Sequence, residues 1–121
     1  LTSMFTELDN RWYADGFTTK NPLIVDAIRT MVAKTPIEGY VAATEAVRDF
    51  DITEQLPDIT ARMLLITGAD DKATPISEAK FISETCPNAD LVILENASHL
   101  ALVEKPKHFD DAVINFITGV N

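Results

Sequence analysis

The spacing of apolar residues changes about halfway along the 121-residue chain. In the first half, apolar side chains recur three and four positions apart, which is typical of one face of an amphipathic helix. This pattern predicts one helix over residues 3–14 and two more that begin near residues 21 and 35. Their apolar positions are Met4, Phe5, Leu8 and Trp12, then Leu23, Ile24, Ala27, Ile28, Met31 and Val32, and finally Ile37, Tyr40, Val41 and Val47. The first half is therefore predicted to be helical.

Both later helices carry a start signal. Asn21 before Pro22 places an N-cap residue ahead of a proline at the first helical position. Thr35 before Pro36 repeats this arrangement, and Glu38, three residues after Thr35, completes the pattern of a capping box. We therefore expect the side chains of Thr35 and Glu38 to cap the third helix.

The second half has a different rhythm. Residues 63–67 form an apolar run without polar alternation, as expected of a strand covered on both faces. Thr74-Pro75 predicts a helix that extends to about residue 85, and residues 89–94 form a second apolar run. Pro106 begins a last helix, which Gly119 is well placed to end. The order strand, helix, strand, helix predicts an α/β fold with a parallel sheet, and the two halves meet around residues 49–60.

An acid and a base follow the two predicted strands. Asp71 lies four residues beyond the first strand and His99 five beyond the second. Parallel strands joined by one crossover helix are often neighbours, so both loops open on the same edge of the sheet. A carboxylate–imidazole hydrogen bond is feasible there, and it would supply the last two members of a Ser-Asp-His triad. Asp70 is the alternative to Asp71.

The nucleophile of such a triad is missing from the chain. Its serines are Ser3, Ser77, Ser83 and Ser98, and none lies in a Gly-x-Ser-x-Gly motif. The first residue is leucine rather than methionine. We therefore expect the chain to be the C-terminal part of a larger enzyme.

Composition narrows the function classes. The formal charge of −9 argues against a nucleic-acid or anionic-membrane partner. No apolar run approaches the roughly 20 residues of a membrane span. The single cysteine, Cys86, fits a reducing cytoplasm. The chain has neither a glycine-rich phosphate loop nor the histidine or cysteine spacing of a metal site, so we expect no cofactor and no metal.

At these residues the chain resembles the α/β-hydrolases, and among them the 3-oxoadipate enol-lactonases, which act in the degradation of aromatic compounds. The matching segments are Arg11-Trp12-Tyr13 with Phe17, residues 35–40, Arg48-Asp49, residues 68–75, Ser98-His99-Leu100 and Glu104-Lys105-Pro106. The resemblance spans essentially the whole chain. One departure is Tyr13-Ala14-Asp15-Gly16, where the family commonly has Phe-Thr-Pro after Arg-Trp.

The resemblance implies a division of the chain and a set of site residues. Residues 1–50 would be part of a helical cap over the active site, and residues 51–121 the C-terminal part of the hydrolase core. The catalytic residues would be Asp71, rather than Asp70, and His99. An enol-lactone substrate with a free carboxylate needs a cation in the pocket, for which Arg11 and Arg48 are candidates. Trp12 is a candidate for the pocket wall, although packing alone also explains an aromatic residue on a helix.

Three functions stay open for the intact protein. The first is a lactonase that opens 3-oxoadipate enol-lactone, and the second a general carboxylesterase of the same fold. The third is a truncated, non-catalytic module that binds a partner through its exposed sheet edge. Because two parallel strands expose both hydrogen-bonding edges, we expect another copy, or the N-terminal part of the hydrolase, to pack there. The chain alone is expected to be inactive.

Overall fold

The computed structural model describes residues 4–119. Its elements are α1 (Phe5–Trp12), α2 (Phe17–Lys20), α3 (Pro22–Ala33), α4 (Ile37–Arg48), the 3₁₀ helix η2 (Thr53–Asp58), β1 (Met63–Gly68), α5 (Ile76–Thr85), β2 (Ala89–Leu94), α6 (Ala101–Glu104) and α7 (Pro106–Thr118). The three helices predicted for the first half correspond to α1, α3 and α4, and the strand–helix–strand–helix order of the second half is as predicted. The predicted start of the first helix, at Ser3, lies outside the described residues. The sequence pattern missed the short helices α2, η2 and α6. Among these helices, none has both the length and the apolar character needed to cross a bilayer.

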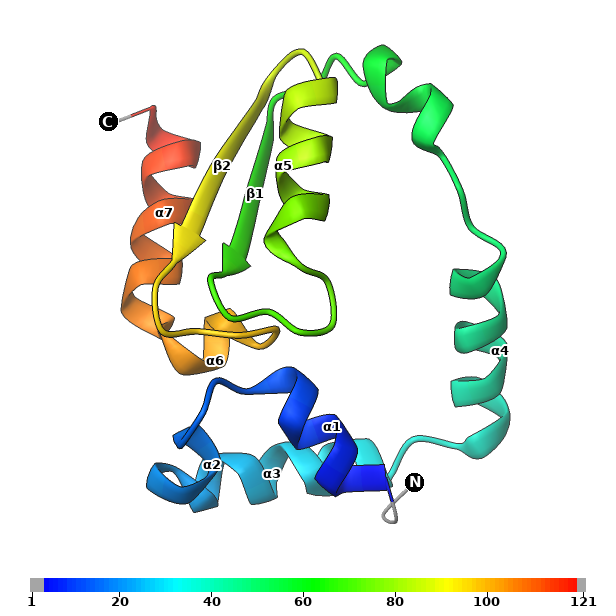
Figure 1. Cartoon of the computed structure of the whole chain (residues 1–121), viewed down its shortest axis with the longest axis vertical. Coiled ribbons are helices and arrows are strands. Elements are labelled where there is room, and N and C mark those ends of the chain that lie inside the picture. Colours follow the sequence, from blue (N-terminus) through cyan, green and yellow to red (C-terminus); the bar gives the residue numbers. More distant parts are fainter. Residues whose placement is uncertain (1–3, 120–121) are drawn as a thin grey trace.

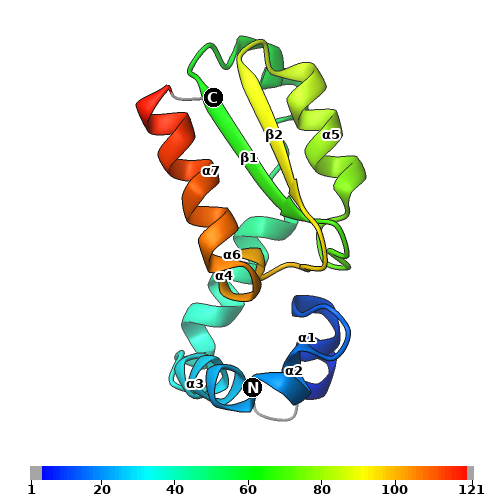
Figure 2. The same ribbon diagram turned by 90° about the vertical axis from the view of Figure 1, so that its left-hand side faces the viewer.

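The sheet consists of two parallel neighbours. β1 and β2 pair in register from Met63 opposite Ala89 to Gly68 opposite Leu94. Helix α5 covers one face of this pair and α7 the other (Figures 1 and 2). The predicted α/β architecture is therefore confirmed, and the loops after both strands open at one end of the sheet.

The main apolar cluster lies directly beneath those loops. Its buried members are Leu94, Ala97 and Ala101, and Ile66, Val92 and Phe109 pack against them. The cluster therefore joins the end of β2 to the start of α6 and to α7. Because Ala97 is fully buried only two residues before His99, the core fixes the base of the loop that carries the histidine.

The helical first half leaves more of its large apolar side chains exposed than the second half does. Helices α1–α3 lie beyond the C-terminal ends of the strands, and α4 stands apart at the side of the molecule (Figure 1). An ion pair between Asp9 and Arg29 joins α1 to α3. The predicted apolar stripes are largely exposed: Leu23 of α3 is 84% exposed and Val47 of α4 is 75% exposed. The one buried position of α3 is Val25, which lies outside the predicted stripe.

The two predicted helix starts have different outcomes. Asn21 is the N-cap residue of α3, with Pro22 at the first helical position, although its side chain donates to the carbonyl of Phe17. The Thr35–Glu38 capping box is wrong, because α4 begins only at Ile37, with Pro36 at the N-cap position. The backbone N–H of Thr35 donates instead to Val32, in the turn that ends α3. Gly119 has a positive φ of 69° and ends α7 as predicted.

Candidate active site

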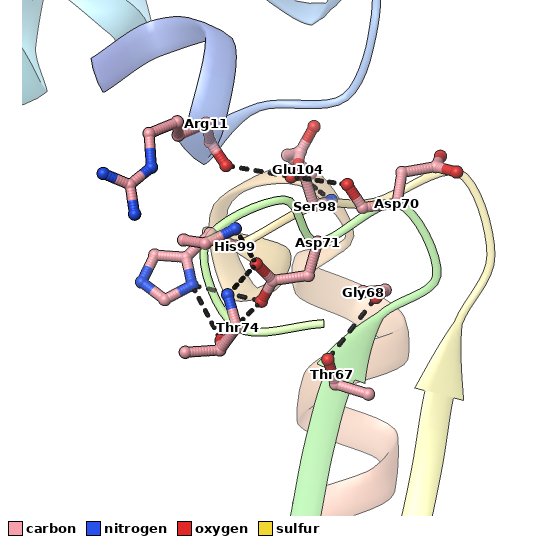
Figure 3. Close-up of polar contacts among 10 residues, drawn as sticks. Arg11, Thr67, Gly68, Asp70, Asp71, Thr74, Ser98, His99 and Glu104 are labelled. Carbon is pink, nitrogen blue, oxygen red and sulfur yellow. Dashed lines mark hydrogen bonds and ion pairs between the residues drawn. The ribbon is translucent and has the colours of Figure 1, made fainter. Parts of the chain in front are cut away.

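The loops after β1 and β2 bring Asp71 and His99 together. The Nδ1 atom of His99 lies 3.1 Å from Oδ2 of Asp71, within hydrogen-bond distance (Figure 3). The two residues are 28 positions apart, and only the parallel pairing of the strands makes them neighbours. The hydrogen bond that the sequence made feasible is therefore present.

Asp71 is held by its own loop as well as by the histidine. Its Oδ1 atom accepts the backbone N–H groups of Ala73 and Thr74 at 2.8 Å each, and its Oδ2 atom accepts the hydroxyl of Thr74 at 2.9 Å. The side chain is only 5% exposed. Burial by itself would raise the pKa of Asp71, but the hydrogen bonds from Thr74, His99 and Ala73 outweigh burial and lower the pKa below its usual value. The carboxylate is therefore ionised at neutral pH.

Thr74 was predicted from the sequence only as part of a helix start, although the signal for its contact with Asp71 was present. An aspartate that accepts N–H groups two and three residues ahead is a common turn arrangement, and here it leads into Pro75 and α5. The spacing Asp-x-x-Thr before a helix is thus enough to predict that Asp71 is oriented locally.

The network around His99 assigns its tautomer. Nδ1 faces the Asp71 carboxylate at 3.1 Å and the Thr74 hydroxyl at 3.3 Å. An ionised carboxylate only accepts hydrogen bonds, so the proton is assigned to Nδ1 and Nε2 is left as the acceptor. The side chain of His99 is 35% exposed, so the ring is accessible. An oriented imidazole with a free Nε2 is the arrangement of the base in a Ser-Asp-His triad.

A close backbone approach at Gly68 positions the histidine loop. A Cβ atom at Gly68 would overlap the carbonyl oxygens of Ala97 and Ser98, so only glycine fits here without movement of the backbone. The N–H of Asp70 donates to the carbonyl of Ala97 at 2.9 Å and ties the two loops together. Before the structure, Gly68 was notable only as part of the segment that resembles the family, because nothing local in the sequence marks a contact with residues 97 and 98.

Ser98, next to the histidine, is buried and hydrogen-bonded through both its side chain and its backbone N–H. It is fully buried, and its Oγ atom lies 3.0 Å from the carbonyl oxygen of Asp70 and 3.2 Å from that of Arg11. Its N–H donates to Oε2 of Glu104 at 2.6 Å. A serine whose hydroxyl is buried against carbonyl oxygens is a structural residue, so Ser98 does not supply the missing nucleophile.

Asp70 does not take part in the pair. It is exposed, and its side chain points away from the imidazole of His99 (Figure 3). Of the two neighbouring aspartates, the structure therefore places Asp71 at the histidine, as the family resemblance implied.

The three candidate substrate-binding residues lie in different places. Arg11 is exposed at the end of α1, and its side chain extends on the same side of the loops as the His99 ring (Figure 3). Trp12 is half-buried, and its carbonyl accepts the N–H of Leu100 at 3.0 Å. Arg48 lies at the end of α4 and makes two 2.8 Å hydrogen bonds to the adjacent Asp49. The structure thus brings Arg11 and the backbone of Trp12 to the histidine loop, and places Arg48 on the separate helix α4.

A cleft beside the two loops does not include the pair in its lining. It has a volume of about 610 Å³, and its lining includes Asp70, Lys72 and Lys105 but neither Asp71 nor His99. Across residues 4–119, no group of three or more histidine, cysteine, aspartate or glutamate side chains could hold a metal ion. Of the pair, the Asp71 side chain is buried and the His99 side chain is 35% exposed.

Comparisons with known proteins agree on one group of relatives. A family model described as TAP-like protein matches residues 37–120. The chain is 34% identical to 3-oxoadipate enol-lactonase 2 of Acinetobacter baylyi, over 93% of this chain and 42% of that protein. The structure matches an enol-lactonase from Burkholderia xenovorans LB400 with a TM-score of 0.91 and 26% identity, over 96% of this chain and 44% of that one. A thermophilic esterase from Thermogutta terrifontis matches with a TM-score of 0.89 and 25% identity, over 98% of this chain and 44% of that one. The chain spans less than half the length of these relatives.

Proposed function

The chain belongs to the α/β-hydrolases, and from that premise we propose that it is the C-terminal part of a serine hydrolase that opens 3-oxoadipate enol-lactone. Residues 1–50 then form part of a cap over the active site, and residues 51–121 complete the core. The single observation that carries this proposal is the 3.1 Å contact between His99 and Asp71 at the edge of the sheet where α/β proteins bind their ligands.

The reaction uses a serine supplied by the part of the protein outside this chain. Nε2 of His99 takes the proton of that serine as its Oγ attacks the lactone carbonyl. The ring C–O bond then breaks, and the proton passes from His99 to the leaving oxygen. His99 next takes a proton from water as the water oxygen attacks the acyl-serine; the bond to Oγ then breaks, His99 returns the proton to Oγ, and the acid leaves. Asp71 holds Nδ1 throughout and stabilises the imidazolium that forms in each half of the reaction.

Substrate binding is assigned to the end of α1. The expected lactone carries a carboxylate, which needs a cation near the histidine. Arg11 fits this role because it is exposed and extends on the His99 side of the loops. Trp12, the next residue of α1, is half-buried, and its place in the pocket wall stays a prediction. Arg48 is the weaker candidate, because Asp49 already pairs with its guanidinium.

The N-terminal part of the hydrolase is the proposed partner. Within the described residues, each strand is paired along one edge only, so β1 and β2 both have an unpaired edge. The apolar stripes of α3 and α4 are also uncovered, with Leu23 and Val47 among their members. Over half of each relative's length has no counterpart in this chain, which is enough to supply the nucleophile and cover these surfaces. The chain alone is expected to be inactive, and a stable, well-folded monomer in size-exclusion chromatography would contradict this pairing.

The test is an assay of the assembled hydrolase, this chain together with the N-terminal part, on the enol-lactone and on simple aryl esters. A clear preference for the enol-lactone supports the lactonase, whereas equal or better turnover of aryl esters supports a general carboxylesterase. His99→Ala should lower kcat by at least about 10⁴-fold in either case. If His99→Ala leaves turnover intact, the assignment of the base is wrong. The absence of a Gly-x-Ser-x-Gly motif upstream would favour the non-catalytic interaction module.

A further inference from the structure

Glu104 connects two segments that are far apart in sequence. Its Oε1 atom accepts the backbone N–H of Ala14 at 2.8 Å, and its Oε2 atom accepts the backbone N–H of Ser98 at 2.6 Å. Ala14 follows α1 and is 90 positions away, whereas Ser98 immediately precedes His99. We call these two hydrogen bonds the Glu104 bridge.

The bridge satisfies backbone groups that have little access to water. Ser98 is fully buried, and Ala14 is half-buried. A buried N–H without an acceptor destabilises the structure, and a carboxylate is a stronger acceptor than a neutral group. Loss of the Glu104 carboxylate would therefore force both N–H groups to move towards water or towards another acceptor.

His99 lies between two residues that are bonded to the end of α1. On one side, Ser98 contacts the carbonyl of Arg11 through Oγ and Ala14 through Glu104. On the other side, the N–H of Leu100 donates to the carbonyl of Trp12 at 3.0 Å. The backbone of the histidine is thus fixed by a segment outside its own strand, while its side chain is fixed by Asp71.

We propose that Glu104 is a positioning residue for His99, and that the Glu104 bridge couples the helical segment at α1 to the alignment of the imidazole. This inference rests on the proposed function, because alignment affects turnover only if His99 is the base. Displacement of a catalytic group by about 1 Å can lower a rate by about 100-fold. Glu104 itself does not contact the reacting atoms in this scheme.

A second contact at the same junction provides a matched control. Lys72 and Asp15 form an ion pair of 3.0 Å between the Asp71 loop and the turn after α1. Both side chains are exposed, Asp15 almost completely, and such pairs contribute little. Asp15→Asn therefore removes a charge from the same junction without disturbing the backbone of the histidine loop.

The test compares Glu104→Gln, Glu104→Ala and Asp15→Asn in the assembled hydrolase. Glutamine keeps the size of the side chain but has one acceptor oxygen, so one of the two bonds is lost. We expect Glu104→Gln to lower kcat by about 10- to 100-fold with KM within about threefold, and Glu104→Ala to lower kcat further. Asp15→Asn should leave both constants within about twofold. In proton NMR, the Nδ1–H resonance of His99 should persist in Asp15→Asn and broaden or disappear in Glu104→Gln.

An unchanged kcat in Glu104→Gln would overturn the inference, because the bridge would then stabilise the fold without aligning His99. This holds whether or not KM or the melting temperature changes. If Glu104→Ala does not fold, Glu104→Gln decides alone. If the wild-type hydrolase shows no turnover, or if His99→Ala is fully active, the proposed function fails separately. The NMR comparison still decides the role of Glu104 in that case, since an unaltered Nδ1–H resonance would contradict the positioning of His99.

Discussion

The helical segment (residues 4–50) and the strand segment (residues 51–119) differ in how they bury apolar side chains. In the strand segment, Leu94, Ala97 and Ala101 form a shared core beneath the loops of Asp71 and His99. In the helical segment, Leu8, Tyr13 and Val25 are buried, but most of the apolar stripe of α3 is exposed and α4, like α5 and α7, has no buried residue. The candidate catalytic pair thus lies on the part with its own core, while the helical part contacts it mainly through the end of α1.

Under the proposed function, the strand segment supplies the catalytic pair, and the helical segment requires the N-terminal part to cover its apolar faces. Contacts within the strand segment hold the Asp71 side chain, whereas the residues on either side of His99 are also bonded to the end of α1. Under the proposed function, the exposed apolar faces of α3 and α4 would pack against the N-terminal part of the hydrolase. The N-terminal part of the hydrolase should therefore change the stability cost of substitutions in the helical segment more than that of substitutions in the strand segment.

The largest expected effect comes from truncation of one apolar side chain in each segment. Leu94→Ala should lower the free energy of unfolding by about 2–5 kcal/mol, because it leaves a cavity in the core. In the assembled hydrolase Val47→Ala should cost about 1 kcal/mol or more, because the N-terminal part would cover this side chain, which is exposed in the chain described here. Urea unfolding of the assembled hydrolase measures both costs, and a cost below about 0.5 kcal/mol at Val47, as expected of an exposed side chain, would show that α4 stays uncovered.

The next effect tests the close approach in the strand segment. Gly68→Ala places a Cβ against the carbonyl oxygens of Ala97 and Ser98, and backbone cannot move aside as a flexible side chain can. We expect a loss of about 1–3 kcal/mol in the free energy of unfolding. Gly39→Ala in α4 is the control, because nothing lies within 4 Å of the added Cβ, and it should stabilise the helix by up to about 1 kcal/mol. Equal effects at the two glycines would contradict the described packing.

A smaller effect should appear on acidification. The pKa of Asp71 is lower in the folded chain than its usual value, because hydrogen bonds from Thr74, His99 and Ala73 outweigh burial. An aspartate with a lowered pKa stabilises the fold above its unfolded pKa of about 3.9, and this contribution is lost as the pH falls through the folded value. Asp71→Asn should therefore flatten the decline of thermal stability below about pH 4. A decline that is identical in both proteins would show that Asp71 makes no such contribution.

The smallest effect concerns a buried hydroxyl of the helical segment. Tyr13 is 2% exposed, its ring stacks on Phe17 with centroids 5.2 Å apart, and its hydroxyl has no hydrogen-bond partner within the described residues. Burial and the nearby Asp9 raise the pKa of Tyr13 to about 12. Tyr13→Phe keeps the stacking and removes the unpartnered group, so stability should stay within about 1 kcal/mol or improve slightly. A larger loss would reveal an acceptor supplied by the N-terminal part.

The strands and the candidate pair were predictable because their signals are local. Residues 63–67 and 89–94 are short apolar runs, and the structure has strands at Met63–Gly68 and Ala89–Leu94. Given two adjacent parallel strands, the distances of Asp71 and His99 from their ends are sufficient to bring the side chains together. The geometry of a parallel pair thus converts sequence spacing into proximity.

The contacts that join the two segments were not predictable in this way. Glu104 reaches Ala14 across 90 positions, and Gly68 is fixed by carbonyl groups of residues 97 and 98. No periodicity or local motif encodes such long-range backbone contacts. The Thr35–Glu38 cap failed for a different, local reason, because the N–H of Thr35 donates to Val32 at the end of α3 and α4 begins only at Ile37.

The most direct measurement compares Asp71→Asn with Asp70→Asn in the assembled hydrolase. The two substitutions remove the same charge from adjacent residues of one loop, and only Asp71 contacts His99. If Asp71 orients the base, Asp71→Asn should lower kcat by about 10⁴-fold, whereas Asp70→Asn should leave kcat close to that of the wild type. Retention of full activity by Asp71→Asn, or a greater loss in Asp70→Asn, would contradict the assignment of the acid and base at this sheet edge.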